Sequence, residues 1–265
     1  MPEKINKKEN KNANTRRPRK SNSPNDRNKP VFDIDSWKPK TTIGKKVKDK
    51  EITDINQLLD NGVNILEPEI IDVLIPDIKT DLLLIGQSKG KFGGGQRRVF
   101  KQTQKKTREG NKPKFATMAV VGNEDGYVGI GYGKSKETVP AREKAYRNAK
   151  LNLFKIRRGC GSWECGCKNP HSIPFAVEGK CSSSRIKLMP APKGKGLIIE
   201  PEIGKILKHA GIKDVWSKTQ GQTKTKINLI YACVDALRNL TSTKISPDYE
   251  SNMNVVNGIE NPKQE

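Results

Sequence analysis

The chain is poor in apolar residues, which make up only 33% of its 265 positions. That share is low for a globular protein, so we expect part of the chain not to fold on its own. No apolar run approaches the roughly 18 residues that a membrane-spanning helix needs. The first residues, MPEKINKKEN, contain no apolar core of the kind found in a secretory signal. These absences argue against a membrane protein and against a secreted one.

Cysteine and histidine are also scarce, with 5 Cys and 2 His. In a chain that is not exported, clustered cysteines indicate metal binding or catalysis rather than disulfides. The sequence contains no GxxxxGK[ST] phosphate-binding loop, no evident pair of catalytic carboxylates, and no evident acidic partner for a Cys–His nucleophile. We therefore predict that the protein is not an enzyme.

Positive charge is what the chain has in excess, with a formal net charge of +22. Residues 86–158 carry 19 Lys or Arg against 5 Asp or Glu, whereas residues 31–85 have a net charge of −4. Solubility requires a net charge of only about 2–8 for a small domain, so a merely soluble basic protein explains this excess poorly. A phosphate backbone is the expected partner, because each Lys or Arg contact releases condensed counterions.

Composition divides the chain into segments and predicts an α+β fold. We expect, in order, a disordered basic arm (1–35), an N-terminal docking segment (36–77), a first domain (78–158), a Cys-rich linker (159–170), a second α/β domain (171–240) and a mobile polar tail (241–265).

Three strands and one helix are expected in the first domain, with strands at 82–87, 115–122 and 127–134. Asn123–Gly126 is a turn sequence between the last two strands. The helix follows from about residue 139 to 154. Its alanines and a leucine at i, i+4 spacing form a narrow seam that can lie close against a sheet, namely Ala141, Ala145, Ala149 and Leu153. The glycine-rich, basic residues 90–112 predict a long loop that is disordered without RNA.

Glycines recur in the segment GYVGIGYGK, which ends at Lys134. We interpret the missing side chains as room for a sugar-phosphate backbone, with Lys134 and Lys136 as phosphate partners. A bulged, twisted strand would explain the same glycines. A nucleotide-binding loop is disfavoured because the glycines lie within the predicted strand.

In the second domain we expect strands at 173–177, 184–189, 197–199 and 212–216, and helices at 201–210 and 225–240. Upstream, a short helix is expected at 54–60, and residues 69–75 read as a strand or the start of a buried helix.

Cys160, Cys165, Cys167 and His171 have the spacing C-x4-C-x-C-x3-H. Three thiols and one imidazole within so short a segment suit a tetrahedral structural zinc site. Cys181 is an alternative fourth ligand. Free thiols at the junction between the domains are the competing interpretation.

Two long stretches resemble the family of the fifth small-subunit ribosomal protein in its archaeal form. They are VVGNEDGYVGIGYGKSKETVPAREKAYRNAKLNL and, after RRGCGSWECGCKNPHSIPF, the segment GKCSSSRIKLMPAPKGKGLIIEPEIGKILKHAGIKDVWSKTQGQT. The resemblance covers about residues 36–240. It implies a β-β-β-α domain like those that bind double-stranded RNA, followed by an α/β domain with a left-handed βαβ crossover.

The resemblance also implies a cytoplasmic location in the small ribosomal subunit and no homo-oligomer. The expected partners are small-subunit rRNA, the fourth and eighth small-subunit proteins, and messenger RNA at the channel through which it enters. Roles in subunit assembly, decoding accuracy and messenger unwinding would follow. A free-standing RNA chaperone or processing factor is the alternative, and it would not co-migrate stably with small subunits at high salt.

Two features depart from the family: the segment 86–114 is longer than usual, and the arm at 1–30 has no counterpart. By position, Lys89, Lys91, Arg97 and Arg98 are the candidates for messenger contact. The full set of residues expected to bind RNA is Lys89, Lys91, Arg97, Arg98, Lys101, Lys105, Lys106, Arg108, Lys112, Lys114, Lys134, Lys136, Arg142, Arg147, Arg157, Arg158, Lys193, Lys195, Lys218 and Lys224.

Overall fold

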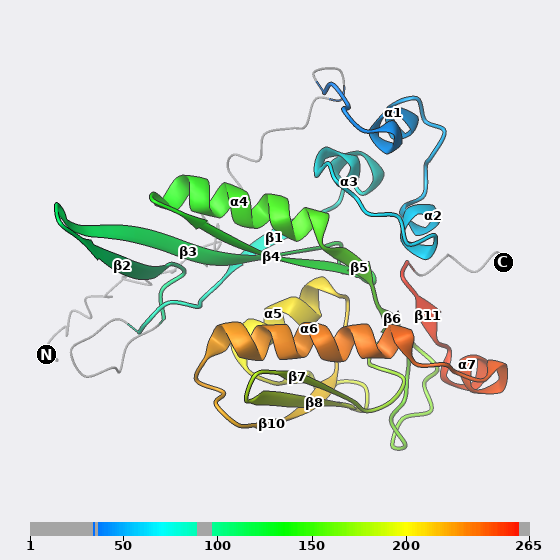
Figure 1. The fold of residues 1–265 in the computed structure, drawn as a ribbon. Coiled ribbons are helices and arrows are strands. Elements are labelled where there is room, and N and C mark those ends of the chain that lie inside the picture. Colours follow the sequence, from blue (N-terminus) through cyan, green and yellow to red (C-terminus); the bar gives the residue numbers. More distant parts are fainter. Residues whose placement is uncertain (1–33, 35–36, 89–96, 260–265) are drawn as a thin grey trace, which may run out of the picture. The chain divides into compact units, whose positions relative to one another are not determined.

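The computed structural model describes residue 34, residues 37–88 and residues 97–259 (Figure 1). The basic arm, apart from residue 34, lies outside the described residues, and so do Lys89 and Lys91. In the part of the chain that is described, no helix has the length and apolar content needed to cross a bilayer.

The segment that precedes the first domain forms three short helices: α1 (Thr42–Lys48), α2 (Ile55–Asp60) and α3 (Glu69–Leu74). The sequence predicted α2, left α3 open between strand and helix, and did not predict α1. The acidic side chains of this segment pair with the basic first domain, since Asp72 lies 2.6 Å from Lys150 Nζ and Asp60 lies 2.7 Å from Lys155 Nζ. Acidic side chains of this segment therefore help to hold it against the first domain.

The first sheet contains β1 (Lys79–Leu83), β2 (Lys101–Thr107), β3 (Gly110–Gly122), β4 (Tyr127–Ser135) and β5 (Leu153–Lys155), all antiparallel. The order is β1-β3-β4-β5, with β2 paired to the first half of β3. Helix α4 (Thr138–Leu151) covers one face of this sheet (Figure 1). The predicted turn, strands and helix are confirmed here, although β1 lies a few residues earlier than expected. The helix ends at Leu151, and Leu153, predicted to belong to its seam, begins β5 instead.

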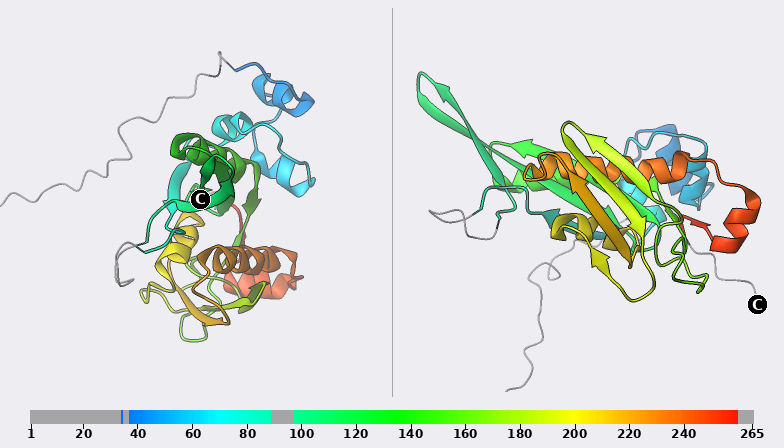
Figure 2. Two further views of the ribbon diagram at one scale, coloured as in Figure 1. Left: turned by 60° about the vertical axis from the view of Figure 1, so that its left-hand side comes forward. Right: turned by 90° about the horizontal axis from the view of Figure 1, so that it is seen from below.

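The long loop predicted at 90–112 is wrong for the described residues from Lys101 onwards. Residues 101–107 form β2, which pairs along its whole length with β3 and makes a two-stranded ribbon that projects from the sheet (Figure 2). Its side chains are almost all exposed and polar, so they show no buried face by which a strand is recognised in a sequence. The first half of β3 extends beyond the core with exposed side chains, and β2 pairs with this half.

The glycines of β4 do not make room for a nucleic acid, which corrects that interpretation. A Cβ built on Gly129, Gly131 or Gly133 would lie 2.1–2.2 Å from backbone atoms of α4. The buried alanine seam of α4 packs against this glycine face. Glycine on the strand and alanine on the helix together let the two backbones approach closely, as the seam predicted.

The second sheet contains β7 (Val177–Cys181), β8 (Ser184–Pro190), β9 (Leu197–Ile198) and β10 (Val215–Gln220), in the order β7-β8-β10-β9. Helices α5 (Pro201–His209) and α6 (Lys226–Ser242) accompany it. Strands β9 and β10 are parallel and are joined through α5, and the other pairs are antiparallel. The strand predicted at 173–177 is wrong, because β7 begins where that prediction ends. The strand predicted at 212–216 is shifted towards the C-terminus.

One hydrophobic core joins the two sheets. It includes Met118 and Val120 of β3 together with Leu188 of β8 and Leu207 of α5, all fully buried. The buried carboxylate of Glu202 accepts a hydrogen bond of 2.7 Å from the Leu84 amide across the same contact. The two domains therefore share their interior rather than being joined only by a linker.

The polar tail, predicted to be mobile, has regular structure over its described residues. It forms α7 (Pro247–Met253) and β11 (Val256–Asn257), and β11 pairs with β6 (Arg157–Arg158). The buried Arg158 guanidinium donates to the Gly258 carbonyl at 3.1 Å and forms an ion pair with Asp125. A charged side chain remote in sequence thus fixes the tail.

Candidate metal centre and basic surface

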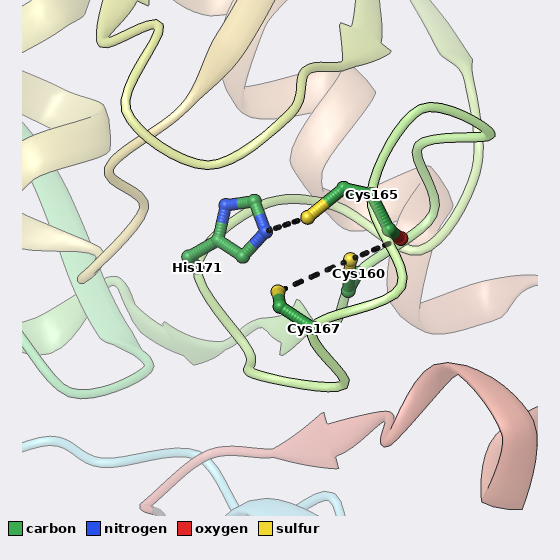
Figure 3. A group of neighbouring side chains, drawn as sticks. All are labelled: Cys160, Cys165, Cys167 and His171. Carbon is green, nitrogen blue, oxygen red and sulfur yellow. Dashed lines mark hydrogen bonds between the residues drawn. The ribbon is translucent and has the colours of Figure 1, made fainter.

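The four residues of the C-x4-C-x-C-x3-H segment converge on one point (Figure 3). Their ligand atoms all lie within 4.8 Å of one another. Cys160 Sγ is 3.6 Å from Cys167 Sγ, and Cys165 Sγ is 3.8 Å from His171 Nε2. Bond lengths to zinc of about 2.3 Å to sulfur and 2.0–2.1 Å to nitrogen give tetrahedral edges of about 3.5–3.8 Å. The cluster therefore fits a metal ion that takes three sulfurs and one nitrogen.

Backbone hydrogen bonds close the loop that carries the ligands. The Cys160 amide donates to the Met253 carbonyl at 3.1 Å, and the Cys165 amide donates to the Ser162 carbonyl at 3.2 Å. Gly159 and Ser172 form a bridge that brings the two ends of the loop together. The ordered tail is thus also part of the frame that holds Cys160.

Asp214 orients the histidine, and sequence reasoning missed it. Its Oδ2 atom lies 2.8 Å from His171 Nδ1, and both side chains are buried. Because a carboxylate oxygen only accepts, Nδ1 donates this hydrogen bond, and Nε2 is the ring nitrogen that faces the thiols and could coordinate a metal. A metal-binding histidine commonly donates its second nitrogen to a carboxylate in this way. Asp214 is distant in sequence, and only the fold brings it to the cluster.

The thiols differ in their electrostatic surroundings. The nearby backbone amides of Lys193 and Cys167 lower the pKa of the Cys165 thiol to about 6. Burial raises the pKa of the Cys160 thiol to about 11, and neighbouring Cys167 adds to the effect. A bound cation would favour the thiolate at both positions, since the thiolate is the form that coordinates metals. Cys181, the alternative ligand, is not part of this cluster.

The ribbon of β2 and β3 carries six of the twenty predicted RNA-binding residues. The side chains of Lys101, Lys105, Lys106, Arg108, Lys112 and Lys114 are all exposed. Glu109 is the acidic residue among them and lies 2.7 Å from Lys112 Nζ.

A surface hollow of about 580 Å³ joins the base of the ribbon to the start of α4. Lys114, Lys134, Lys136 and Lys144 line it, with Glu137 as the one acidic lining residue. The N-terminus of α4 adds the positive end of a helix dipole. Lys114 of the ribbon and the pair Lys134 and Lys136, all predicted to bind RNA, thus lie around one positively charged hollow.

The other predicted basic residues divide into exposed and engaged ones. Exposed side chains are Arg98, Arg142, Arg147, Lys193, Lys195, Lys218 and Lys224.

Three arginines are engaged within the protein. Arg157 donates to Asn257 Oδ1 and to carbonyls at the end of α6. Half-buried Arg97 donates to the Lys224 carbonyl at 3.2 Å. Buried Arg158 holds the tail, so its assignment to RNA is corrected.

Comparison with known proteins gives consistent matches. The family model for "Ribosomal protein S5, N-terminal domain" matches residues 96–157, and that for "Ribosomal protein S5, C-terminal domain" matches residues 179–248. The chain is 48% identical over 217 residues to small ribosomal subunit protein uS5 of Nanoarchaeum equitans, which covers 82% of this chain and 93% of that protein. It is 45% identical over 227 residues to the protein of the same name from Methanocaldococcus jannaschii, covering 86% of this chain and 98% of that protein. The corresponding protein of Pyrobaculum calidifontis is 45% identical over 209 residues, covering 79% of this chain and 96% of that protein.

Proposed function

Since the chain belongs to the ribosomal protein S5 family and is a structural, non-enzymatic constituent of the small ribosomal subunit, we propose that it binds the RNA of that subunit through the β2–β3 ribbon and the lysine-lined hollow. These surfaces gather cations at the periphery of the first sheet, where a phosphate backbone can reach them. Contacts of this type position RNA without reading its sequence.

The register of the ribbon is the observation that carries the proposal. Lys105 pairs with Lys112, and Thr103 pairs with Lys114. Because paired residues share a face and neighbours along a strand alternate, Lys101, Lys105, Lys112 and Lys114 lie on one face. Like charges directly opposite each other destabilise a sheet. A phosphate chain along this face would relieve the repulsion.

A pair of charge-neutral variants tests this proposal. Lys105→Gln with Lys112→Gln removes two facing charges, and Lys45→Gln with Lys46→Gln removes two exposed charges from α1 as a control. Binding of the full chain to small-subunit rRNA transcribed in vitro would be measured over a range of salt concentrations. The slope of log affinity against log salt should fall by about 1.4–1.8 for the ribbon variant, at 0.7–0.9 per phosphate contact, and should not change for the control. An unchanged slope in the ribbon variant would overturn the proposal.

At the level of fold, we infer that the first domain, 78–158, is of the double-stranded-RNA-binding type and that the β9–α5–β10 unit is the left-handed crossover of the family. The other boundaries that we infer are an N-terminal arm to residue 35, a docking segment at 36–77, a linker at 159–170 and a second domain at 171–240. The parallel pairing of β9 with β10 supports the crossover.

We further propose that the Cys3His cluster binds one structural zinc ion. The three sulfurs and one nitrogen suit zinc, which is commonly tetrahedral in structural sites with such ligands. The filled d shell of zinc imposes no geometry of its own. With four protein ligands there would be no open position for a substrate, which suits a structural role.

From the family we propose that the protein contacts the fourth and eighth small-subunit proteins and does not form a homo-oligomer. We also propose that it lies beside the channel through which messenger RNA enters. Lys89, Lys91, Arg97 and Arg98 are proposed to help separate messenger duplexes, and anchoring of rRNA is the competing role. Their replacement by alanine should slow translation of a messenger with a hairpin just downstream of the decoding site, and leave an unstructured messenger and subunit assembly nearly normal. Equal slowing of both messengers, or failed assembly, would make these residues rRNA anchors.

A further inference from the structure

The exposed loop that follows β8 is attached to the Cys3His centre through Asp214. This loop, residues 190–196, contains Lys193 and Lys195, and both side chains are exposed. The amides of Gly194 and Gly196 donate to Asp214 Oδ1 at 3.1 and 2.7 Å. Two amides of the loop are therefore bonded to the residue that orients the histidine of the centre.

Packing holds the start of the loop, where Ala191 is fully buried, but does little to hold residues 193–196. Gly194 and Gly196 have φ values of +89° and +73°, and a Cβ at either position would meet no atom within 4 Å. Glycine is required here by backbone conformation and not by crowding. Elsewhere in the loop, the Ala191 amide donates to Ser172 Oγ at 3.3 Å, the Lys195 amide donates to the Pro192 carbonyl at 3.3 Å, and the Gly196 carbonyl accepts from the Val215 amide at 3.2 Å. The two bonds to Asp214 are thus the side-chain restraints on the part of the loop that carries the lysines.

The two carboxylate oxygens of Asp214 accept hydrogen bonds from different parts of the protein. Oδ2 accepts from the imidazole of His171, and Oδ1 accepts from the two loop amides. The side chain is only 6% exposed, so its charge depends on these donors. Coordination of His171 through Nε2 would keep the proton on Nδ1 and hold the ring towards Asp214. Loss of the ion would free the ring to turn, which would weaken the attachment of the loop to Asp214.

We propose that the Cys3His centre positions Lys193 and Lys195 for contact with RNA phosphates, with Asp214 as the positioning residue between the centre and the loop. Metal binding and RNA binding are then coupled through the loop. This inference rests on the proposed RNA-binding function, but the conformational part can be measured without RNA.

The first test compares amide hydrogen exchange in the zinc-loaded full chain, in the chain after chelation, and in zinc-loaded Asp214→Asn. An asparagine has one acceptor oxygen where the carboxylate has two, so it cannot serve both His171 and the loop. Exchange at Gly194 and Gly196 should be faster in the chelated chain and in the variant, whereas amides of the β2–β3 ribbon should be unchanged. Metal content must be measured for the variant, since loss of such a partner typically weakens metal affinity by 10–100-fold. Unchanged exchange at both glycines would overturn the proposal.

Should chelation also raise exchange in the ribbon, the chain as a whole has loosened, and zinc-loaded Asp214→Asn decides the question alone. Faster exchange confined to the loop supports the inference, and equal exchange in variant and unsubstituted protein refutes it.

The second test measures binding to small-subunit rRNA with Lys193→Gln and Lys195→Gln combined. The salt slope should fall by about 1.4–1.8 for two lost phosphate contacts, and chelation of this variant should lower affinity no further. If chelation and the lysine substitutions instead lower the RNA affinity additively, the metal does not act through this loop. If the ribbon variant also leaves RNA binding unchanged, the proposed function is what fails, whereas loss of binding in the ribbon variant alone refutes only the role of this loop.

Discussion

Gly131 of β4 offers a sharp test of how the first domain is built, through the substitution Gly131→Ala. A Cβ at this position would lie 2.1 Å from the Ala149 nitrogen, 2.2 Å from the Ala145 oxygen and 2.7 Å from the Asn148 carbonyl carbon. All three are backbone atoms of α4, so no side chain can rotate away to make room. The helix itself would have to move by about 1.4 Å or more to restore contact distances of about 3.5 Å.

The expected loss of stability is set by two opposing effects. Replacing glycine by alanine restricts the unfolded chain and can stabilise by about 0.4–1 kcal/mol where the fold tolerates it. Overpacking a core typically costs about 1–3 kcal/mol, and rigid backbone on the opposing side places this site at the upper end. We therefore expect a net destabilisation of about 2 kcal/mol.

Urea unfolding of the full chain, followed by circular dichroism, measures the effect. Gly204→Ala in α5 is the matched control, because a Cβ there meets only Ile199 Cγ2, at 3.7 Å. Alanine is better than glycine within a helix by up to about 1 kcal/mol, so the control should be neutral or more stable. A midpoint for Gly131→Ala at or above that of the unsubstituted protein would refute the packing argument. An equal fall in the control would show a general sensitivity to added methyl groups.

Three further predictions concern the metal, the tail and the docking segment. Protein purified without chelator should hold about one equivalent of zinc and Cys165→Ser should release it; elemental analysis that finds none in the unsubstituted protein would contradict the zinc proposal. Arg158→Met should expose the tail to proteolysis and destabilise the fold by about 1–3 kcal/mol, while Arg147→Met on the exposed face of α4 should do neither. Burial opposes ionisation of Glu67, but amides of Thr41 and Lys40 donate to its carboxylate and hold its pKa below 4.5. That stabilisation is present above the unfolded pKa and is lost as the pH falls through the lowered value. The protection of the Thr41 amide, taken relative to its intrinsic exchange rate at each pH, should therefore fall in acid, and Glu67→Gln should remove this pH dependence.

Elements whose stability depends on neighbours in sequence were predictable. The hairpin of β3 and β4 follows from the turn at Asn123, whose Oδ1 accepts from the Asp125 amide at 2.9 Å, and the position of α4 follows from its alanine seam. The ribbon was not predictable from periodicity, because Lys, Gln and Thr alternate there without a buried face. The tail depends on Arg158 and the histidine depends on Asp214, and these partners are far apart in the chain.

The error about the β4 glycines shows what was missing from the sequence reasoning. The glycines repeat every second residue, which places them on one face of a strand, and the alanines repeat every fourth residue, which places them on one face of a helix. Taken together, the two patterns predict backbone packing, whereas the glycines taken alone suggested open space. The same arrangement recurs in the second domain, where a Cβ on Gly179 would lie 2.1 Å from the Ala232 oxygen of α6.

This packing also limits how the protein can contact RNA. Helix α4 closes one face of the first sheet, and the shared core buries the other, on which Met118 and Val120 lie. No open sheet surface remains there for stacking of bases over the body of the described sheet. The groups free to meet RNA are cations at the periphery: the ribbon, the start of α4 and the loops of the second domain. Lysine and arginine at such places bind phosphates and do not distinguish bases. We therefore expect recognition to depend on the folded shape of the RNA, with the spacing between the ribbon, the hollow and the loop after β8 deciding which phosphates are contacted together.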